Sequence, residues 1–351
     1  MTLTKEEKKQ YDRHLILDEI GEAGQLKLKQ AKVLVIGAGG LGCAVLQYLT
    51  AAGVGTIGII DDDVVSQSNL QRQILYTIDD IGISKAKTAA KRMARLNPFI
   101  HFKVCNEKLT RINALALFQR YDIIVDGSDN FATRYLTNDA AVITKKPLVY
   151  GAIFKFEGQV SVFNYLESAT YRCLYPSPPK PEQAPNCSQI GVLGVLPGII
   201  GSFQANETVK IICGIGAVLA NKLMVYNVLT MHQILLNFEK DLKNTVVVLE
   251  QDYDFFCGLA AQEEISFKEL LADKEKYNLL DVRETWERDQ FHIDGQHIPL
   301  AELSLRIHEV YTNKVVVVYC KSGIRSKKAI DLLIQNNFPT ALLNLKEGCF
   351  Q

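Results

Sequence analysis

Short apolar runs alternate with amphipathic stretches through the first 150 residues of the chain. Apolar runs of strand length occur at residues 32–36, 55–60, 121–125 and 147–152. Between them, stretches of helix length cover residues 41–52, 84–97 and 132–144. Ser84 can cap the second of these helices, and the Asn97-Pro98 pair stops it. Strands that alternate with helices predict a doubly wound α/β domain.

The pattern changes after residue 170. Several prolines fall between residues 171 and 186, which excludes a helix or a central strand there. We expect a long loop that leads into Cys187. Beyond this loop, the sequence predicts a buried helix at residues 205–212 and a strand at residues 245–249.

The α/β pattern restarts near residue 262. Ser266 can cap a helix at residues 267–272, and the segments that follow are a strand at 278–281, a strand at 315–320 and a helix at 326–335. We therefore predict two domains, residues 1–258 and a smaller α/β domain at residues 262–351.

Composition and charge exclude several classes of protein. The chain has 351 residues, with 39 Lys and Arg, 39 Asp and Glu, and 48% hydrophobic residues. These values are typical of a globular protein and give no net charge for binding nucleic acid. The N-terminus is polar, and the apolar stretch at 190–203 is interrupted by glycines and a proline. We expect a cytoplasmic protein that binds neither membrane nor nucleic acid.

A glycine-rich turn joins the first strand to the helix that follows it. Gly37, Gly39 and Gly42 form a G-x-G-x-x-G motif, in which backbone amides at a helix N-terminus can hold a phosphate. Asp61 ends the next strand, where an acid can bind ribose hydroxyls. Alone, these features favour a nicotinamide-dependent oxidoreductase.

The residues after Asp61 change this interpretation. Arg72 and Lys85 are cations that a dehydrogenase does not need there, but that a triphosphate requires for charge neutralisation. Asp126 and Asp129 follow the strand at 121–125, where ligands bind in open α/β sheets. One of these two carboxylates could hold Mg²⁺. Together the residues favour a nucleotide–metal site.

These motifs together resemble the MoeB/ThiF family of adenylyltransferases, which are relatives of ubiquitin-activating enzymes. The resemblance covers about residues 5–258 and rests on Arg13-His14, GAGGLG (37–42), Asp61 and Asp63, NLQRQ (69–73), Lys85 and DGSDN (126–130). It implies a Rossmann-like ATP-binding domain. It also implies ATP-dependent adenylylation of the C-terminal glycine of a small ubiquitin-like sulfur carrier that ends in Gly-Gly.

The resemblance assigns roles to the matched residues. The nucleotide-binding residues that it implies are Gly37, Gly39, Gly40, Gly42, Asp61, Asp63, Asn69, Arg72, Gln73, Lys85, Asp129 and Asn130. Arg72 acts on the phosphates, and Asp129 holds Mg²⁺. Arg13 reaches the nucleotide of a partner subunit, which implies a homodimer; a surface salt bridge is the alternative for Arg13.

The thiols of the first domain raise two further questions. Cys187 matches a loop cysteine of the family that is proposed to bond covalently to the carrier, and both a direct role and a dispensable thiol stay open. The family usually has two C-x-x-C pairs that bind zinc. Here Thr170 and Asp254 stand where each pair would begin, before Cys173 and Cys257. Two thiolates and one carboxylate make a weak site, so we expect no bound zinc.

The second domain carries a different candidate nucleophile. Cys320 ends an apolar strand and begins a loop with Lys321 and Arg325 that turns into a helix. Backbone amides and cations around a sulfur lower the pKa of the thiol and stabilise a persulfide anion. With DVRE (281–284) and HIPL (297–300), the segment resembles a rhodanese domain. The plain alternative is a buried cysteine at a strand end.

The resemblance implies a combined reaction. Arg13, Arg72 and Asp129 would act in adenylylation, and Cys320 would carry sulfur supplied by a cysteine desulfurase or another donor, with Cys187 as a further thiol. Molybdopterin, thiamine and tRNA-thiolation pathways each use such a carrier. A nicotinamide-dependent oxidoreductase and a non-catalytic module that senses sulfur or docks a partner are the alternatives from other classes.

Overall fold

The structure is a computed structural model that describes residues 2–179, 191–257, 264–336, 338–346 and 348. Its chain divides into two compact units, Met1–Leu259 and Ala260–Gln351. Cys187 lies outside the described residues.

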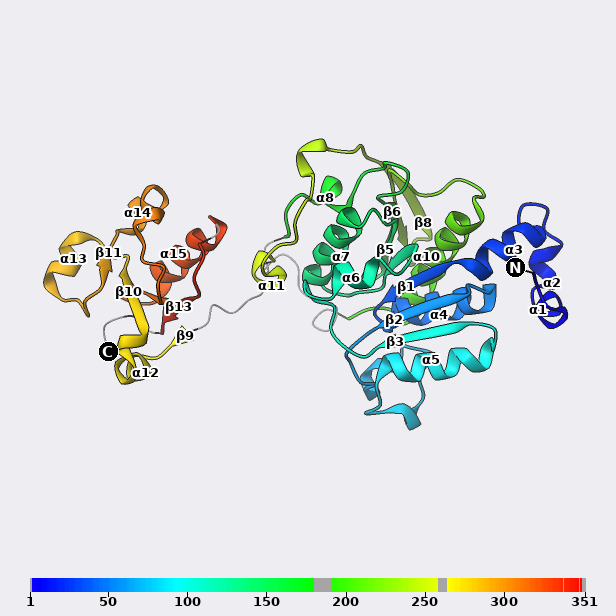
Figure 1. The fold of residues 1–351 in the computed structure, drawn as a ribbon, viewed down its shortest axis with the longest axis horizontal. Coiled ribbons are helices and arrows are strands. Elements are labelled where there is room, and N and C mark those ends of the chain that lie inside the picture. Colours follow the sequence, from blue (N-terminus) through cyan, green and yellow to red (C-terminus); the bar gives the residue numbers. More distant parts are fainter. Residues whose placement is uncertain (1, 180–190, 258–263, 337, 347, 349–351) are drawn as a thin grey trace. The chain divides into compact units, whose positions relative to one another are not determined.

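An eight-stranded mixed sheet forms the centre of the first unit (Figure 1), with the order β3-β2-β1-β4-β5-β6-β7-β8. The strands from β3 to β5 in this order are parallel, and those from β5 to β8 pair antiparallel. Their bounds are β1 (Lys32–Ile36), β2 (Thr56–Ile60), β3 (His101–Cys105), β4 (Ile123–Asp126), β5 (Leu148–Phe154), β6 (Glu157–Phe163), β7 (Lys222–Asn227) and β8 (His232–Asn237).

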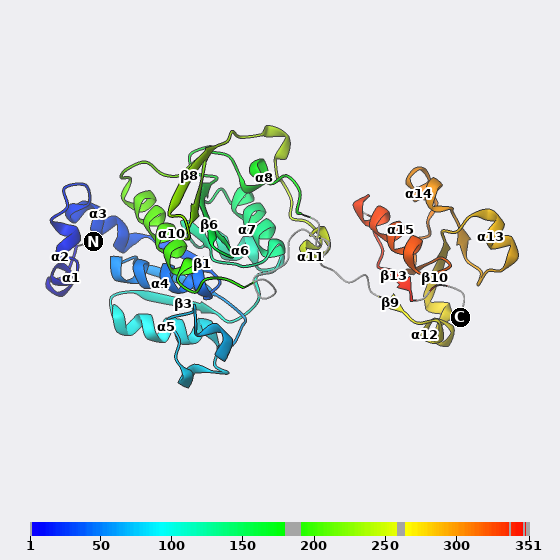
Figure 2. The same ribbon diagram turned by 180° about the vertical axis from the view of Figure 1, so that it is seen from behind.

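Helices cover both faces of this sheet (Figure 2). Val33 and Val35 of β1 pack in the core under α3, α4, α5 and α10, whereas Leu34 and Ile36 pack in the core under α6 and α7, with α8 and α11 beside it. The alternation follows from the two-residue period of a strand. The bounds are α1 (Lys5–Gln10), α2 (Asp12–Leu15), α3 (Gly21–Gln30), α4 (Gly40–Ala52), α5 (Lys85–Leu96), α6 (Ala114–Phe118), α7 (Phe131–Ile143), α8 (Tyr171–Leu174), α10 (Leu196–Cys213) and α11 (Tyr253–Phe256).

The predicted alternation of strands and helices is confirmed. The four expected strands are β1, β2, β4 and β5, with ends that differ by one or two residues. The Ser84 hydroxyl accepts a hydrogen bond from the backbone N–H of Lys87 at 3.3 Å, and α5 ends at Leu96, as Asn97 and Pro98 predict. The glycine turn therefore lies between β1 and α4, as the sequence indicates.

Two predictions for the first unit are wrong. Residues 245–249 form no strand, and Val247 and Val248 are 80% and 72% exposed. A β-branched run has strand propensity, but it forms a strand only when it pairs with another one, and no strand of the sheet pairs with these described residues. The segment 171–186 begins with the short helix α8, because Tyr171–Leu174 precedes the first proline, Pro176.

The second unit is a five-stranded parallel sheet with the order β11-β10-β12-β13-β9. Val316 and Val318 pack in the core with residues of α14 and α15, and Val317 packs in the core with Leu270 of α12 on the other face. The bounds are β9 (Glu264–Ile265), α12 (Phe267–Ala272), β10 (Tyr277–Asp281), α13 (Thr285–Gln290), β11 (Gln296–His297), α14 (Leu300–Arg306), β12 (Val315–Tyr319), α15 (Ile324–Gln335) and β13 (Leu342–Leu345).

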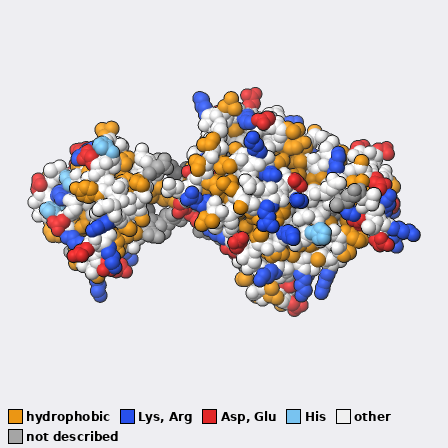
Figure 3. Space-filling view, in the orientation of Figure 1, with side chains coloured by type: hydrophobic (Ala, Val, Ile, Leu, Met, Phe, Trp, Pro, Cys, Tyr) orange, Lys and Arg blue, Asp and Glu red, His pale blue; other side chains and the backbone are white. Residues whose placement is uncertain are grey.

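The described surface shows no membrane-spanning element. Within the described residues, every helix is too short or too polar to cross a bilayer. On the face shown in Figure 3, acidic and basic side chains are interspersed, in keeping with the net charge of zero.

The separate cores of the two units lead to a prediction about stability. Trp286, the single tryptophan, lies on α13, so its fluorescence reports on the second unit. Leu49 and Leu280 are fully buried in the first and second unit. We expect Leu49→Ala and Leu280→Ala each to cost about 3 kcal/mol in its own unit.

In urea unfolding, Leu280→Ala is expected to lower the midpoint of the Trp286 fluorescence transition. Leu49→Ala is expected to leave that midpoint in place while it lowers the transition seen by far-UV circular dichroism. Equal shifts of the fluorescence midpoint in both variants would show that the units unfold as one.

Candidate active sites

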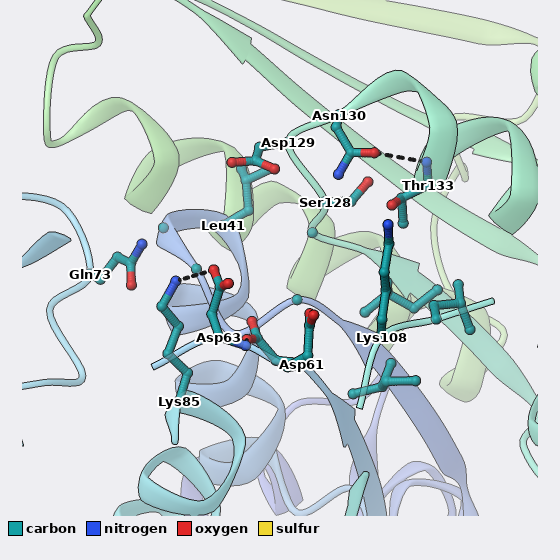
Figure 4. A pocket seen from close by; sticks show the side chains of 18 of the residues that line it. Leu41, Asp61, Asp63, Gln73, Lys85, Lys108, Ser128, Asp129, Asn130 and Thr133 are labelled. Carbon is teal, nitrogen blue, oxygen red and sulfur yellow. Dashed lines mark hydrogen bonds and ion pairs between the residues drawn. The ribbon is translucent and has the colours of Figure 1, made fainter. Parts of the chain in front are cut away.

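A cavity of about 360 Å³ lies at the carboxyl ends of β1, β2 and β4 (Figure 4). Parallel strands place the loops that follow them at one edge of the sheet, which brings together motifs that are far apart in the sequence. Of the residues predicted from the sequence, those that line the cavity are Gly37, Gly39, Gly40, Asp61, Asp63, Arg72, Gln73, Lys85, Asp129 and Asn130.

The glycine turn has no room for a side chain at two of its positions. Gly37 has φ +83°, and a Cβ there would lie 3.0 Å from the carbonyl oxygen of Gly127. A Cβ at Gly42 would lie 2.0 Å from the carbonyl oxygen of Gly37, which no real contact allows. Gly42 does not line the cavity, but the lack of a side chain there lets the first turn of α4 pack against Gly37.

Asp61 holds the glycine turn against the end of β2. One carboxylate oxygen accepts the backbone N–H of Ala38 at 2.7 Å, and the other accepts that of Asp63 at 2.8 Å. Burial raises the pKa of Asp61, although these hydrogen bonds and Lys85 oppose the shift. Each carboxylate oxygen keeps a second lone pair, which can accept a hydrogen bond from a ligand hydroxyl.

Two predicted cations flank the cavity. Lys85 is 5% exposed, and its Nζ lies 2.8 Å from Oδ2 of Asp63 in a cavity wall (Figure 4). Arg72 donates to the backbone carbonyl of Ser68 at 3.0 Å, a contact that leaves other guanidinium N–H groups available. A buried lysine in a low-dielectric cavity is a strong electrostatic partner for a phosphate.

Three buried polar atoms at the cavity have no hydrogen-bond partner in the described structure. They are Oε1 of Gln73, Oγ of Ser128 and Nε of Arg134, and all three residues line the cavity. Buried polar groups are rarely left without partners. A polar ligand with both donors and acceptors would satisfy them, so the residues present fit a nucleotide.

The two carboxylates after β4 have different environments. Asp126 is fully buried, which raises its pKa, and it accepts the backbone N–H of Ser128 at 2.9 Å. Asp129 is exposed and lies at the cavity (Figure 4), while Asn130 caps α7 by accepting from the N–H of Thr133 at 2.9 Å. Of the two acids, Asp129 is the accessible one.

The cavity lining differs from the predicted set in both directions. Arg13 on α2 has a side chain that is 87% exposed, and Arg13 and Asn69 do not line the cavity, although both lie in the described part of the chain. Lys108 and Leu109 line it but were not predicted. Both residues follow β3, whose sequence HFKVC mixes polar and apolar residues. A prediction of this strand would have placed Lys108 and Leu109 at the edge of the sheet where the cavity lies.

Cys320 lies at the end of β12, at the start of the loop that leads into α15. Burial raises the pKa of its thiol, but the Ser326 hydroxyl and the N–H groups of Ser326, Ser322 and Arg325 outweigh this effect, so the pKa lies below its usual value. The Ser326 N–H lies 3.4 Å from Sγ. This arrangement of amides favours a thiolate or another sulfur anion.

Arg325 of this loop is held by Glu287 of α13. The two side chains form a bidentate pair with N–O distances of 2.5 and 2.7 Å. The hydrogen bond from Arg325 lowers the pKa of Glu287 to about 2, so the carboxylate stays ionised. The pair ties α13 to the loop that carries Cys320.

An ion-pair cluster joins the segments that were compared with zinc-binding pairs. Arg172 donates to both oxygens of the fully buried Asp139 at 2.7 Å and to Glu250 at 3.1 Å, and Tyr253 donates to Asp139 at 2.7 Å. The guanidinium also lies 4.6 Å from the ring centre of Phe256. We call these five residues the Arg172 cluster.

The residues at the positions of the family's two C-x-x-C pairs lie in other environments. The Thr170 hydroxyl lies 3.4 Å from Sγ of Cys173, and burial raises the pKa of Cys257 to about 12. Within the described residues, no group of three or more His, Cys, Asp or Glu side chains could hold a metal. The Arg172 cluster instead connects α8 to the segment 250–256.

Comparisons with known proteins match both units of the chain to known families. Residues 11–247 match the ThiF family, and residues 266–351 match the Rhodanese-like domain. A protein described as "Probable adenylyltransferase/sulfurtransferase MoeZ" from Mycobacterium tuberculosis is 43% identical over 97% of this chain and 91% of its own length. A "Sulfur carrier protein adenylyltransferase" from Thermus thermophilus is 47% identical over 74% of this chain and 100% of its own length.

Solved structures show the same fold at lower identity. The crystal structure of Escherichia coli MccB has a TM-score of 0.60 and 20% identity, and the alignment covers 69% of this chain and 73% of that chain. MccB with MccA-N7isoASN has a TM-score of 0.61 and 20% identity, with 68% and 74% covered. At this identity the similarity concerns the fold alone.

The Arg172 cluster leads to a prediction about stability. Asp139→Asn leaves the guanidinium of Arg172 buried beside a neutral partner, and we expect it to lower the free energy of unfolding of the first unit by about 3 kcal/mol. The exposed Asp79 is a matched control, since Asp79→Asn removes an acid with no such partner. Thermal unfolding followed by circular dichroism measures both.

If the Arg172 cluster rather than a metal joins these segments, EDTA is expected to leave the unfolding temperature of the natural chain unchanged. A drop in that temperature on chelation, restored by zinc, would contradict this prediction.

The Glu287–Arg325 pair leads to a prediction about pH. Because the folded-state pKa of Glu287 is lowered from 4.5 to about 2, the pair stabilises the protein fully above pH 4.5 and loses its effect as the pH falls through about 2. We expect Glu287→Gln to cost about 2 kcal/mol at pH 7. In urea unfolding followed by Trp286 fluorescence, the gap between the two proteins is expected to close at acid pH; a gap independent of pH would refute the prediction.

Proposed function

The chain belongs to the ThiF family and continues into a rhodanese-like domain, and from this premise we propose that it activates a small sulfur carrier protein with ATP and then transfers sulfur to it. The chain is an adenylyltransferase and sulfurtransferase. The observation that supports the proposal most directly is the cavity in which Lys85, Arg72 and the glycine turn surround space for a polyphosphate.

We assign a task to each part of the cavity. Backbone amides of the turn at Gly39 and Gly40 and the cations Arg72 and Lys85 bind the phosphates of ATP, and Asp61 accepts the ribose hydroxyls. A carrier carboxylate then attacks the α-phosphorus, the bond to the β-phosphate oxygen breaks, and pyrophosphate leaves. Fixed cations stabilise the charge that develops on the phosphate oxygens during this step.

Asp129 is the side chain that we assign to Mg²⁺. The ion prefers few protein carboxylates together with water and phosphate oxygens, which agrees with one exposed acid at the cavity. When bound, it neutralises phosphate charge. Asn130, as the cap of α7, holds the loop that presents Asp129.

Cys320 carries the sulfur in the second step. The terminal sulfur of a Cys320 persulfide, charged by a cysteine desulfurase or another sulfur donor, attacks the acyl carbon of the adenylate. AMP leaves with the bonding electrons, and an acyl disulfide forms. A second thiol then attacks the Cys320 sulfur, which releases the carrier thiocarboxylate and leaves a disulfide. We assign this thiol to Cys187, which lies outside the described residues. Molybdopterin, thiamine and tRNA-thiolation carriers are the candidate substrates.

Arg13 supports the proposal of a homodimer. Its side chain is 87% exposed, lies 3.6 Å from Oδ2 of Asp12 in a surface ion pair that leaves other N–H groups available, and does not line the cavity of its own chain. We propose that Arg13 completes the nucleotide site of a second copy. The family match displaces the oxidoreductase and binding-module alternatives, and we place the protein in the cytoplasm.

Separate variants test the two sites. Asp129→Ala is expected to lower ATP–pyrophosphate exchange at least about 100-fold, because charge stabilisation of the phosphates is lost, and to leave thiosulfate cleavage at Cys320 unchanged. Cys320→Ala is expected to do the reverse. Exchange is measured with a panel of purified carriers that end in Gly-Gly, and intact mass shows whether a carrier has gained sulfur in place of oxygen.

Asp79→Ala and Cys105→Ser, which change residues outside both sites, serve as controls. Loss of both activities in either folded test variant would refute two separate sites. The absence of exchange with every carrier would refute the proposed function.

A further inference from the structure

The hydroxyl group of Ser326 has three neighbours that compete for one proton. Its Oγ lies 2.6 Å from Oδ1 of Asn344, 3.1 Å from the carbonyl oxygen of Gly323 and 3.4 Å from Sγ of Cys320. Ser326, Cys320 and Asn344 are at most 1% exposed, so water does not supply further partners. A serine hydroxyl donates one hydrogen bond only. When Asn344 takes this proton, the sulfur of Cys320 cannot receive it.

Glu264 determines which end of the Asn344 amide faces Ser326. The Nδ2 group of Asn344 donates to Oε1 of Glu264 at 3.3 Å, and Nζ of Lys327 lies 2.8 Å from the same oxygen. The hydrogen bond from Lys327 lowers the pKa of Glu264, so its carboxylate is ionised and only accepts. The amide N–H₂ must therefore face Glu264, and the amide oxygen must face Ser326.

We propose that Asn344, oriented by Glu264, is a positioning residue that competes with Cys320 for the Ser326 proton and thereby limits the ionisation of the thiol. With the proton on the Asn344 side, backbone amides alone stabilise the thiolate. With the proton turned toward Sγ, the thiolate gains one more donor. The inference rests on the proposed function, in which the Cys320 thiolate takes up sulfur.

The charged groups around this cluster come from every neighbouring element. They are Lys321 and Arg325 in the loop, Lys327 on α15, Glu287 on α13, Glu264 on β9, Lys346 after β13, and the buried Asp281–Arg283 pair at the end of β10. Substitution of Asn344 or Ser326 by an uncharged residue changes none of these charges. A change in the thiol pKa then reports on the hydroxyl proton.

The location of Glu264 gives the arrangement a second consequence. Glu264 begins β9 and follows the segment 258–263, which joins the two units. Its contact with Asn344 therefore connects the start of the second unit to the nucleophile through two side chains. Release of Glu264 from Asn344 would let the amide rotate and present an N–H to Ser326, whose hydroxyl would then donate to the sulfur.

A double-mutant cycle on the full chain tests the proposal. The pH dependence of the ultraviolet absorbance of the thiolate is measured for each protein and for its Cys320→Ser counterpart, and the difference isolates Cys320 among the eight cysteines of the chain. Asn344→Leu removes the competing acceptor, and we expect the midpoint to fall by about half a pH unit to one unit. Ser326→Ala is expected to raise the midpoint. The double variant is expected to match Ser326→Ala alone, because Asn344 acts only through Ser326.

Asn336→Leu, a change at an exposed asparagine of the same unit, is the matched control and is expected to leave the midpoint unchanged. If Asn344→Leu does not fold, Glu264→Ala is compared with and without Ser326→Ala; a fall in the midpoint is expected only when Ser326 is present, whereas the direct effect of removing the Glu264 charge would appear in both backgrounds. An unchanged midpoint in a folded variant, or a fall that persists in the Ser326→Ala background, would overturn the proposal. Because the thiol titration requires no carrier or ATP, failure of the proposed function would leave this measurement intact.

Discussion

The close approach of two backbone turns, at Gly37 and Gly127, is the constraint on which the nucleotide cavity depends. The Gly37 turn follows β1 and the Gly127 turn follows β4, and these strands are neighbours in the sheet. A Cβ at Gly37 would lie 3.0 Å from the Gly127 carbonyl oxygen. Asp61, at the end of β2, holds the Gly37 turn in place by accepting a hydrogen bond from the Ala38 N–H. Sheet order, rather than sequence distance, thus decides which residues form the site.

The second unit uses the same geometric principle for different chemistry. Cys320 follows β12, the central strand of a smaller parallel sheet, and loop amides gather around its sulfur where the glycine turn would gather them around a phosphate. In the proposed function, both sites would stabilise an anion with groups that are already in place before the reaction. A tether between them raises the local concentration of the sulfur donor near an adenylate that water would otherwise hydrolyse.

The sequence predicted the elements whose signals are local and missed those that depend on neighbours. The apolar run of β1, the glycine turn and the Ser84 cap are local signals, and all are found. Residues 245–249 have the composition of a strand, but no strand lies beside them, so they stay irregular. Lys108 was missed because β3 is an edge strand with polar residues. Arg13 and Cys187 remain predictions, since a second copy and the residues 180–190 lie outside what the structure describes.

The Arg172 cluster joins segments that are far apart in the sequence through one buried guanidinium. Here the guanidinium of Arg172 joins α8 to Asp139 of α7, to Glu250 and to the ring of Phe256. Planar, multidentate pairing suits arginine to this task, because each N–H makes a separate bond that can tolerate change in the others. The cost is a buried charge, which is tolerated because Asp139 is buried with it and accepts a further hydrogen bond from Tyr253.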